Sequence, residues 1–301
     1  MPADPLGVRA ACRRVVEEAL EVRLGSLESA VAMVREAPVP PWDSSRHYSG
    51  DHLTEYILVL DTLNFSFWGS GRGYWQLAES LRDAFNSGDP LWDGERLQAL
   101  DENGLTRLIG EFPMAGLRLQ ALHELAALAQ REAGGSIAGL VPPSAPELAG
   151  YLSTNLSSFR DVSTYGDLQV PLLKRAQIAA ADLWGSGAVA FTDVDELTCF
   201  ADYKLPQVLR HLGVLEYSEH LGKRVDARVE LVAGAPEEVE IRAATVMAVE
   251  RLRDRLAQEG RSLKAVELDW ILWSRAQNSD QDGAQEKREM APYHRVRTVF
   301  Y

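Results

Sequence analysis

Hydrophobic residues recur at helical spacing through most of this sequence. Glycine or proline stands at the ends of several of these runs, where it stops or starts a helix. The pattern predicts helices over a segment that includes Val15–Leu20, then over Leu27–Val34, Leu53–Gly69, Leu117–Ala133, Val170–Trp184, Pro206–Gly213, Pro236–Gly260 and Ser262 to about Ala276.

Strand signals are few. One short run, from Val225 to Leu231, alternates apolar and polar residues, which indicates a small hairpin or a loop. We therefore expect a mainly α fold with at most a few short strands.

The domain organisation follows from the absence of repeats and low-complexity tracts. The stretch Gly134–Pro146 is rich in Gly, Pro and Ser and is the best candidate boundary between two helical lobes. Since nothing else in the sequence separates two independent domains, we predict a single domain over residues 1–301.

The composition carries a strong negative charge: 31 basic and 44 acidic residues give a net charge of −13. A field of this sign repels phosphate backbones, so long DNA or RNA is an unexpected partner. A small phosphorylated ligand needs only a few converging cations, which an acidic protein can supply.

Metal chemistry and membrane insertion find no support in the sequence. Cys12 and Cys199 are too few for a disulfide framework or a thiolate metal site, and the six histidines form no HxxxH or HxH spacing. The N-terminal segment lacks the apolar core of a signal peptide. No stretch approaches the roughly 20 apolar residues of a membrane span. We expect no bound metal and a cytoplasmic location.

Aromatic residues are dense between Asp61 and Trp75. Rings such as Phe65, Phe67 and Trp68 beside Asn64 have the chemistry to stack on a flat heterocycle and to form hydrogen bonds with it. The same spacing also suits the packed core of a helix, and the pattern alone leaves both interpretations open.

A second patch combines Lys174, on a predicted helix, with Asp193. Asp193 stands where it can cap a helix, and the positive end of the helix dipole stabilises a carboxylate there. A carboxylate of this kind can stabilise an oxocarbenium-like sugar or activate water. The alternative is an aspartate that only caps its helix.

The third patch is basic, with Lys204 following Asp202 and Tyr203, and with His294, Arg295 and Arg297 close to the end of the sequence. Lys and Arg are natural donors to a 5′-phosphate. Surface ion pairs and a solvated basic tail are the competing interpretation.

Together these patches resemble the queuosine salvage protein family, the queuosine 5′-phosphate N-glycosylases. The similarity runs in order from about residue 50 to the end, and Lys204 stands where an arginine is also found. The segments that carry it are Leu60–Trp68, Gly73–Trp75, Ser158–Asp161, Lys174–Ile178, Phe200–Leu209, Leu215–Ser218, Glu267–Trp273 and His294–Tyr301.

The resemblance implies a helical fold related to the helix–hairpin–helix DNA glycosylases. It also implies hydrolysis of queuosine 5′-phosphate to queuine and ribose 5-phosphate, without a metal or organic cofactor, so that queuine can be salvaged for tRNA modification. The glycine-rich hairpin with which those DNA enzymes grip a DNA backbone has no counterpart here, which again points away from a nucleic-acid polymer.

On this reading Asp193 faces C1′ of the ribose and orients the attacking water, while Lys174 supports it. Phe65, Phe67 and Trp68 stack on the base. Asn64, Asp202 and Asp269 read its polar edges, Tyr203 belongs to the same substrate-binding set, and the candidates for the phosphate are Lys204, Arg160, His294 and Arg295.

Two other classes of function stay open at this point. A glycosylase that acts on damaged DNA would need a basic face and salt-sensitive binding to duplex DNA. A non-catalytic helical protein would bind a nucleobase without turning over its nucleotide.

Overall fold

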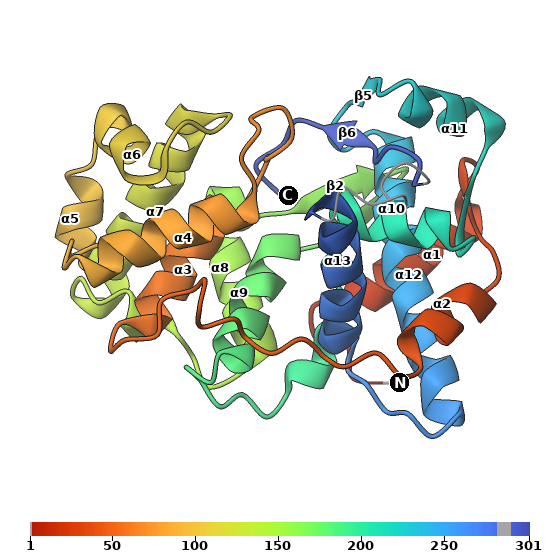
Figure 1. Cartoon of the computed structure of the whole chain (residues 1–301), viewed down its shortest axis with the longest axis horizontal. Coiled ribbons are helices and arrows are strands. Elements are labelled where there is room, and N and C mark those ends of the chain that lie inside the picture. Colours follow the sequence, from red (N-terminus) through yellow and green to blue (C-terminus); the bar gives the residue numbers. More distant parts are fainter. Residues whose placement is uncertain (1, 282–289) are drawn as a thin grey trace. The chain divides into compact units, whose positions relative to one another are not determined.

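Helices dominate the described part of the chain, residues 2–281 and 290–301 of a computed structural model, which contains thirteen α-helices and six short strands (Figure 1). This confirms the predicted mainly α fold. The chain forms two compact units: unit 1 takes the described residues of Met1–Pro40, Val162–Lys174 and Val194–Arg297, and unit 2 takes Pro41–Asp161, Arg175–Asp193 and Thr298–Tyr301.

Unit 1 is built around one long helix, α12 (Pro236–Gln258), which is buried along most of its length. Proline at its first position begins the helix without losing an internal hydrogen bond. The helices that pack on α12 are α1 (Val8–Glu18), α2 (Glu28–Val34), α10 (Lys204–His211) and α13 (Ala265–Gln281); α11 (Glu219–Asp226) completes the helices of this unit.

The strands of unit 1 form three small two-stranded sheets. They pair antiparallel as β1 (Val22–Leu24) with β4 (Leu215–Tyr217) and as β2 (Val162–Tyr165) with β3 (Leu168–Pro171), and parallel as β5 (Glu230–Leu231) with β6 (Arg295–Val296). Each sheet contributes at least one buried side chain to the unit.

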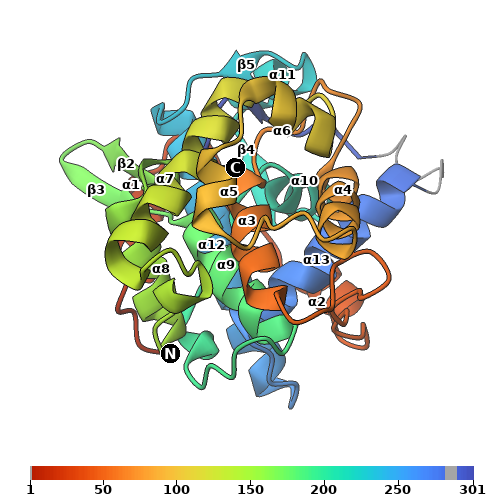
Figure 2. The same ribbon diagram turned by 90° about the vertical axis from the view of Figure 1, so that its left-hand side faces the viewer.

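Unit 2 is centred on α3 (Leu53–Leu63), nearly all of which is buried, and which packs against α4 (Tyr74–Asn86) and α7 (Ala115–Ala133) (Figure 2). Gly134 ends α7 in the left-handed conformation at φ 60°, as the sequence predicts. The remaining helices are α5 (Gly94–Gln98), α6 (Glu102–Ile109), α8 (Ala145–Asn155) and α9 (Lys174–Gly185), whose first residue belongs to unit 1.

Four helix predictions needed correction at their ends or faces. The helix predicted from Val170 begins only at Lys174, because the residues before it form the β2–β3 hairpin. The helix predicted to reach Gly69 ends at Leu63. The first helix ends at Glu18, so Leu20 is exposed and the buried face includes Cys12 and Val15. The last helix begins at Ala265 rather than next to Ser262.

Of the two structures predicted for Val225–Leu231, a small hairpin or a loop, the hairpin is wrong. Val225 lies in α11, and only Glu230–Leu231 forms a strand, whose partner is β6 near the end of the chain. A partner this distant in sequence leaves no local turn signal. The stretch Gly134–Pro146 lies within unit 2, and the assignment of residues 1–301 to one domain stays a prediction.

No helix among the described residues is both long enough and apolar enough to cross a membrane.

Candidate active site

Three ionisable side chains of unit 1, Lys174, Asp202 and Asp269, are buried, and the charges of Lys174 and Asp202 both act on Asp269. Lys174 is the first residue of α9, Asp202 precedes α10, and Asp269 lies on α13. Leu173, directly before the lysine, adopts φ 51°, a left-handed conformation that is rare for a branched side chain. Strained backbone of this kind collects at functional sites, and here it directs the chain into Lys174.

Asp202 sits at the N-terminus of α10. Its Oδ1 accepts hydrogen bonds from the backbone N–H groups of Lys204, at 2.7 Å, and Leu205, at 3.0 Å. Both donors and the positive end of the helix stabilise negative charge on this oxygen. Both bonds use Oδ1, so the carboxylate is held in place through one of its two oxygens.

Asp269 is the acidic neighbour of that carboxylate. Its Oδ1 accepts the N–H of Phe200 at 2.7 Å. Burial raises the pKa of Asp269 well above its usual value and the charge of Asp202 raises it further, whereas the Phe200 N–H and Lys174 act in the opposite direction. Burial thus makes the charged form of the Asp269 carboxyl less favourable than that of an exposed aspartate.

Arg242 on α12 supports the same loop and was not among the residues predicted from the sequence. Its guanidinium is buried, its Nε donates to the carbonyl of Ala201 at 2.9 Å, and its Nη1 lies 3.4 Å from Glu238. The sequence signal that could have identified Arg242 is its pairing with an opposite charge, Glu238, four residues earlier on a predicted helix that is otherwise rich in apolar residues. Arg242 fixes the residue before Asp202.

Lys204 and Tyr203 form a second group with Tyr293. The ring centroids of the two tyrosines are 4.8 Å apart, and Lys204 Nζ lies 5.1 Å from the centre of the Tyr293 ring. Lys204 is buried, so its ammonium is positioned by a cation–π contact instead of by open solvent. The structure thus brings together two residues of the predicted binding set.

His294 is buried in unit 1, whereas its neighbour Arg295 is half-buried in β6. Burial lowers the pKa of His294 to about 3, and the charge of Arg242 contributes in the same direction. The imidazole is accordingly neutral at physiological pH. His294 would therefore meet a phosphate as a neutral group and not as a cation.

The neutral state of His294 predicts a pH effect on stability. Its folded pKa of about 3 lies below the unfolded value, so the unfolded chain binds the proton first and stability falls as pH drops below about 6.5. In His294→Gln, the loss of unfolding free energy between pH 7 and pH 5 should be about 2 kcal/mol smaller than in the parent chain. Urea unfolding at both pH values measures this difference.

His211→Gln, at an exposed position, is the matched control and should lose as much as the parent chain. Equal losses in His294→Gln and the parent would contradict the assignment of a neutral buried imidazole.

In unit 2, Phe65 is fully buried between two guanidinium groups, with Arg118 Cζ 4.2 Å and Arg175 Cζ 4.7 Å from the ring centre. Arg175 in turn donates to the carbonyls of Asp61, Thr62, Ser158 and Val299. These contacts place the Phe65 ring in the core of unit 2, where it holds the end of α3.

The other predicted base contacts lie in the turn after α3. Asn64 is buried and donates to Asp61 at 3.2 Å, whereas Phe67 and Trp68 are half-buried, with Phe67 edge-to-face against Phe112. Ser66, the residue before Phe67, has φ 49°, and its N–H donates to the carbonyl of Tyr301. This turn leaves Phe67 and Trp68 more accessible than Phe65.

Asp193 and Arg160 are both bonded to the backbone of unit 2. Oδ1 of the half-exposed Asp193 accepts the N–H of Ala145, the first residue of α8, at 2.9 Å. The exposed Arg160 donates to the carbonyl of Thr154 at 3.0 Å. Asp193 thus binds the N-terminus of a helix that is distant from it in sequence.

Metal ligands do not cluster in the part of the chain that the structure describes. No group of three or more His, Cys, Asp or Glu side chains there is arranged to hold a metal ion. Cys12 and Cys199 are both buried in unit 1 and are not joined by a disulfide.

Comparison with known proteins relates this chain to one family. The model of the queuosine salvage protein family matches residues 45–301. A protein of Sphaerobacter thermophilus is 42% identical over 329 residues, which covers 100% of this chain and 99% of that protein. A protein of Dictyostelium discoideum is 35% identical over 82% of this chain and 78% of its own length. A protein of Mus musculus is 29% identical over 99% of both. All three are named queuosine 5′-phosphate N-glycosylase/hydrolase.

Proposed function

This chain belongs to the queuosine salvage protein family, and we propose that it hydrolyses the N-glycosidic bond of queuosine 5′-phosphate, releasing queuine and ribose 5-phosphate. The observation that carries the proposal is the full-length similarity to a queuosine 5′-phosphate N-glycosylase/hydrolase at 42% identity. The released queuine would then be available for tRNA modification.

The reaction breaks the bond between C1′ and a nitrogen of the 7-deazaguanine base. Water supplies a hydroxyl group to C1′ and a proton to the departing base, while positive charge develops on the ribose. A carboxylate placed against C1′ stabilises that charge and orients the water.

We assign this task to Asp202. Its carboxylate is held by two backbone N–H groups, and both this carboxylate and Lys174 act electrostatically on Asp269. Lys174 supplies the positive charge that supports the carboxylate or holds a ribose hydroxyl group. Asp269 accepts the N–H of Phe200 and so fixes the backbone that leads to Asp202.

Asp193 was the carboxylate that the sequence predicted for C1′. Its bond to Ala145 gives it a task as a helix-binding residue, which a carboxamide can also perform. We therefore rank it second for the reaction. The stacking roles of Phe67 and Trp68, the base-reading role of Asn64, the phosphate roles of Arg160 and Arg295 and the relation to helix–hairpin–helix glycosylases stay predictions; the buried Phe65 is a support for this turn.

The 5′-phosphate requires cations, and we place Lys204 first among them. It is positioned by the Tyr293 ring, and its ammonium can form a charge-assisted hydrogen bond to a phosphate oxygen. The neutral His294 can donate a hydrogen bond but brings no charge.

Lys204→Met should lower kcat/KM for queuosine 5′-phosphate by roughly 10- to 100-fold and leave kcat/KM for unphosphorylated queuosine nearly unchanged. The ratio of the two substrates cancels any general loss of folded enzyme. Lys223→Met, which removes an exposed lysine paired with Glu219, is the matched control. An undiminished preference for the phosphorylated substrate would remove Lys204 from the phosphate site.

One set of incubations separates this function from its rivals. The proposal requires queuine release from queuosine 5′-phosphate. Steeply salt-dependent binding to duplex DNA with no release would instead favour a DNA glycosylase, and retention of queuine without turnover would favour a binding protein. The net charge of −13 supports a free nucleotide over a polymer. The cytoplasmic location expected from the sequence is also part of this proposal.

A further inference from the structure

The backbone of residues 195–202, which we call the clamped segment, has little regular structure of its own. A short 3-10 turn, η3 (Val194–Glu196), is followed by residues without helix or strand, and Asp202 lies at the end of the segment. A backbone of this kind needs external partners for its N–H and C=O groups when it is buried. Those partners are charged side chains from three helices of unit 1.

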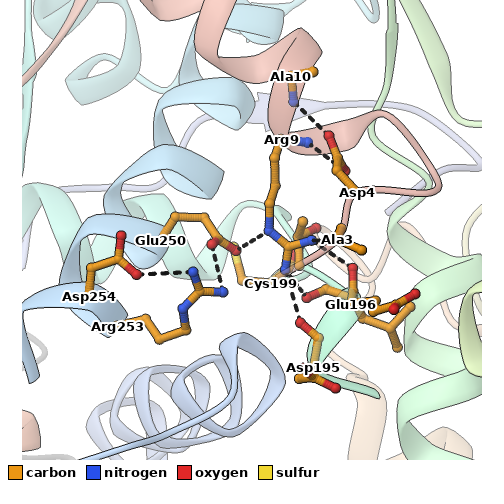
Figure 3. A network of polar contacts seen from close by, with 12 residues as sticks. Ala3, Asp4, Arg9, Ala10, Asp195, Glu196, Cys199, Glu250, Arg253 and Asp254 are labelled. Carbon is orange, nitrogen blue, oxygen red and sulfur yellow. Dashed lines mark hydrogen bonds and ion pairs between the residues drawn. The ribbon is translucent and has the colours of Figure 1, made fainter. Parts of the chain in front are cut away.

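Arg9, on α1, binds the start of the clamped segment (Figure 3). Its guanidinium donates to three successive carbonyls: Glu196 at 2.7 Å, Leu197 at 2.6 Å and Asp195 at 3.3 Å. The side chain is almost completely buried. Only the planar guanidinium offers this many donors in a fixed geometry, since a lysine ammonium is a compact point charge.

A second layer of charge holds Arg9 itself. Its Nε lies 3.0 Å from Glu250 on α12, and Arg253 lies 2.8 Å from the other oxygen of that carboxylate (Figure 3). Both members of the Arg9–Glu250 pair are buried, so the loss of either one leaves an uncompensated charge or unsatisfied carbonyls. Arg9 is therefore held in one orientation.

Two further contacts hold the clamped segment directly before the carboxylate of Asp202. Asp269 binds the N–H of Phe200, and Arg242 binds the carbonyl of Ala201. We propose that Arg9 is a positioning residue for the hydrolysis, because it anchors the start of a segment whose end carries Asp202. The inference rests on the proposed function.

Arg9 precedes the region matched by the family model, which begins at residue 45. The inference thus assigns a task in the reaction to α1, a helix outside that region. A catalytic group held to within a fraction of an ångström depends on supporting contacts of this kind.

The test compares Arg9→Met and Arg9→Lys with Arg14→Met, which removes an exposed arginine from the same helix. Amide hydrogen exchange is followed in peptides that span residues 195–202, with peptides of α7 as the internal reference. Arg9→Met should speed exchange in the clamped segment at least about tenfold relative to the reference. It should lower kcat about 10- to 100-fold while KM changes less than about threefold.

Arg9→Lys keeps a positive charge beside Glu250 and should fold, with effects between those of Arg9→Met and the parent chain. Unchanged exchange in residues 195–202 in both variants would overturn the clamp, and faster exchange with unchanged kcat would overturn the positioning role. If the parent chain itself released no queuine while exchange still rose, the clamp would stand and the proposed function would fail.

Discussion

Replacing Asp202 by asparagine is expected to lower kcat for queuine release by about 10²- to 10³-fold, since electrostatic stabilisation of the transition state contributes several kcal/mol. The carboxamide oxygen of Asp202→Asn can still accept the N–H groups of Lys204 and Leu205, so the start of α10 should be preserved. Single-turnover kinetics with queuosine 5′-phosphate measure the loss at the chemical step.

The matched variant is Asp193→Asn. Its carboxamide oxygen can still accept the N–H of Ala145, so the cap of α8 is retained while the charge is lost. We expect kcat within a few-fold of the parent chain. The opposite pattern, a large loss in Asp193→Asn and a small one in Asp202→Asn, would return the reaction to the carboxylate that the sequence predicted.

The second large effect is on stability. Arg175→Met should lower the free energy of unfolding by about 3 to 5 kcal/mol, because the substitution leaves several buried carbonyls without their donor. Arg175 binds carbonyls at the end of α3, in η2 (Ser157–Phe159) and near the end of the chain, so it joins three parts of unit 2. Burial lowers the pKa of Arg175 to about 9, yet its charged form still predominates at neutral pH.

Urea denaturation at pH 7 measures the effect. Arg131→Met removes an exposed arginine of α7 and should change stability by less than about 1 kcal/mol. A loss below about 1 kcal/mol for Arg175→Met as well would show that these carbonyls do not depend on Arg175.

The sequence predicts the helices well wherever the hydrophobic spacing is regular and a glycine or proline marks the end. The long helix between Pro236 and Gly260 is an example. Prediction from the sequence fails where the pairing of strands decides the structure. The β2–β3 hairpin interrupts an apolar run that also fits a helix, and its local signal was the turn at Gly166, which adopts φ 56°.

Some of the predicted site residues lie together in the structure, and others do not. The structure places five residues that the sequence singled out in unit 1: Lys174, Asp202, Tyr203, Lys204 and Asp269. Lys174 and Asp202 act electrostatically on Asp269, Asp202 accepts the N–H of Lys204, and the ring of Tyr293 contacts Tyr203 and Lys204. Spacing could not show which aspartate lies near Asp269, because Asp193 and Asp202 both bind the N-terminus of a helix and the difference arises in tertiary structure.

The roles of the supporting arginines could not be predicted from the sequence, for a related reason. Arg9, Arg175 and Arg242 bind backbone carbonyls, and carbonyls carry no signature of residue type. A charged residue on the buried face of a helix is one local hint that they offer, and Arg242 adds the opposite charge of Glu238 four residues before it. Their partners become visible only when the chain is folded.

The most direct test of the central claim is a time course of the purified chain with queuosine 5′-phosphate, in which queuine and ribose 5-phosphate are quantified by chromatography and mass. We expect both products to appear in equal amounts, release to be strongly reduced in Asp202→Asn, and unphosphorylated queuosine to be a much poorer substrate. Absence of queuine above the no-enzyme background, from a folded chain, would contradict it.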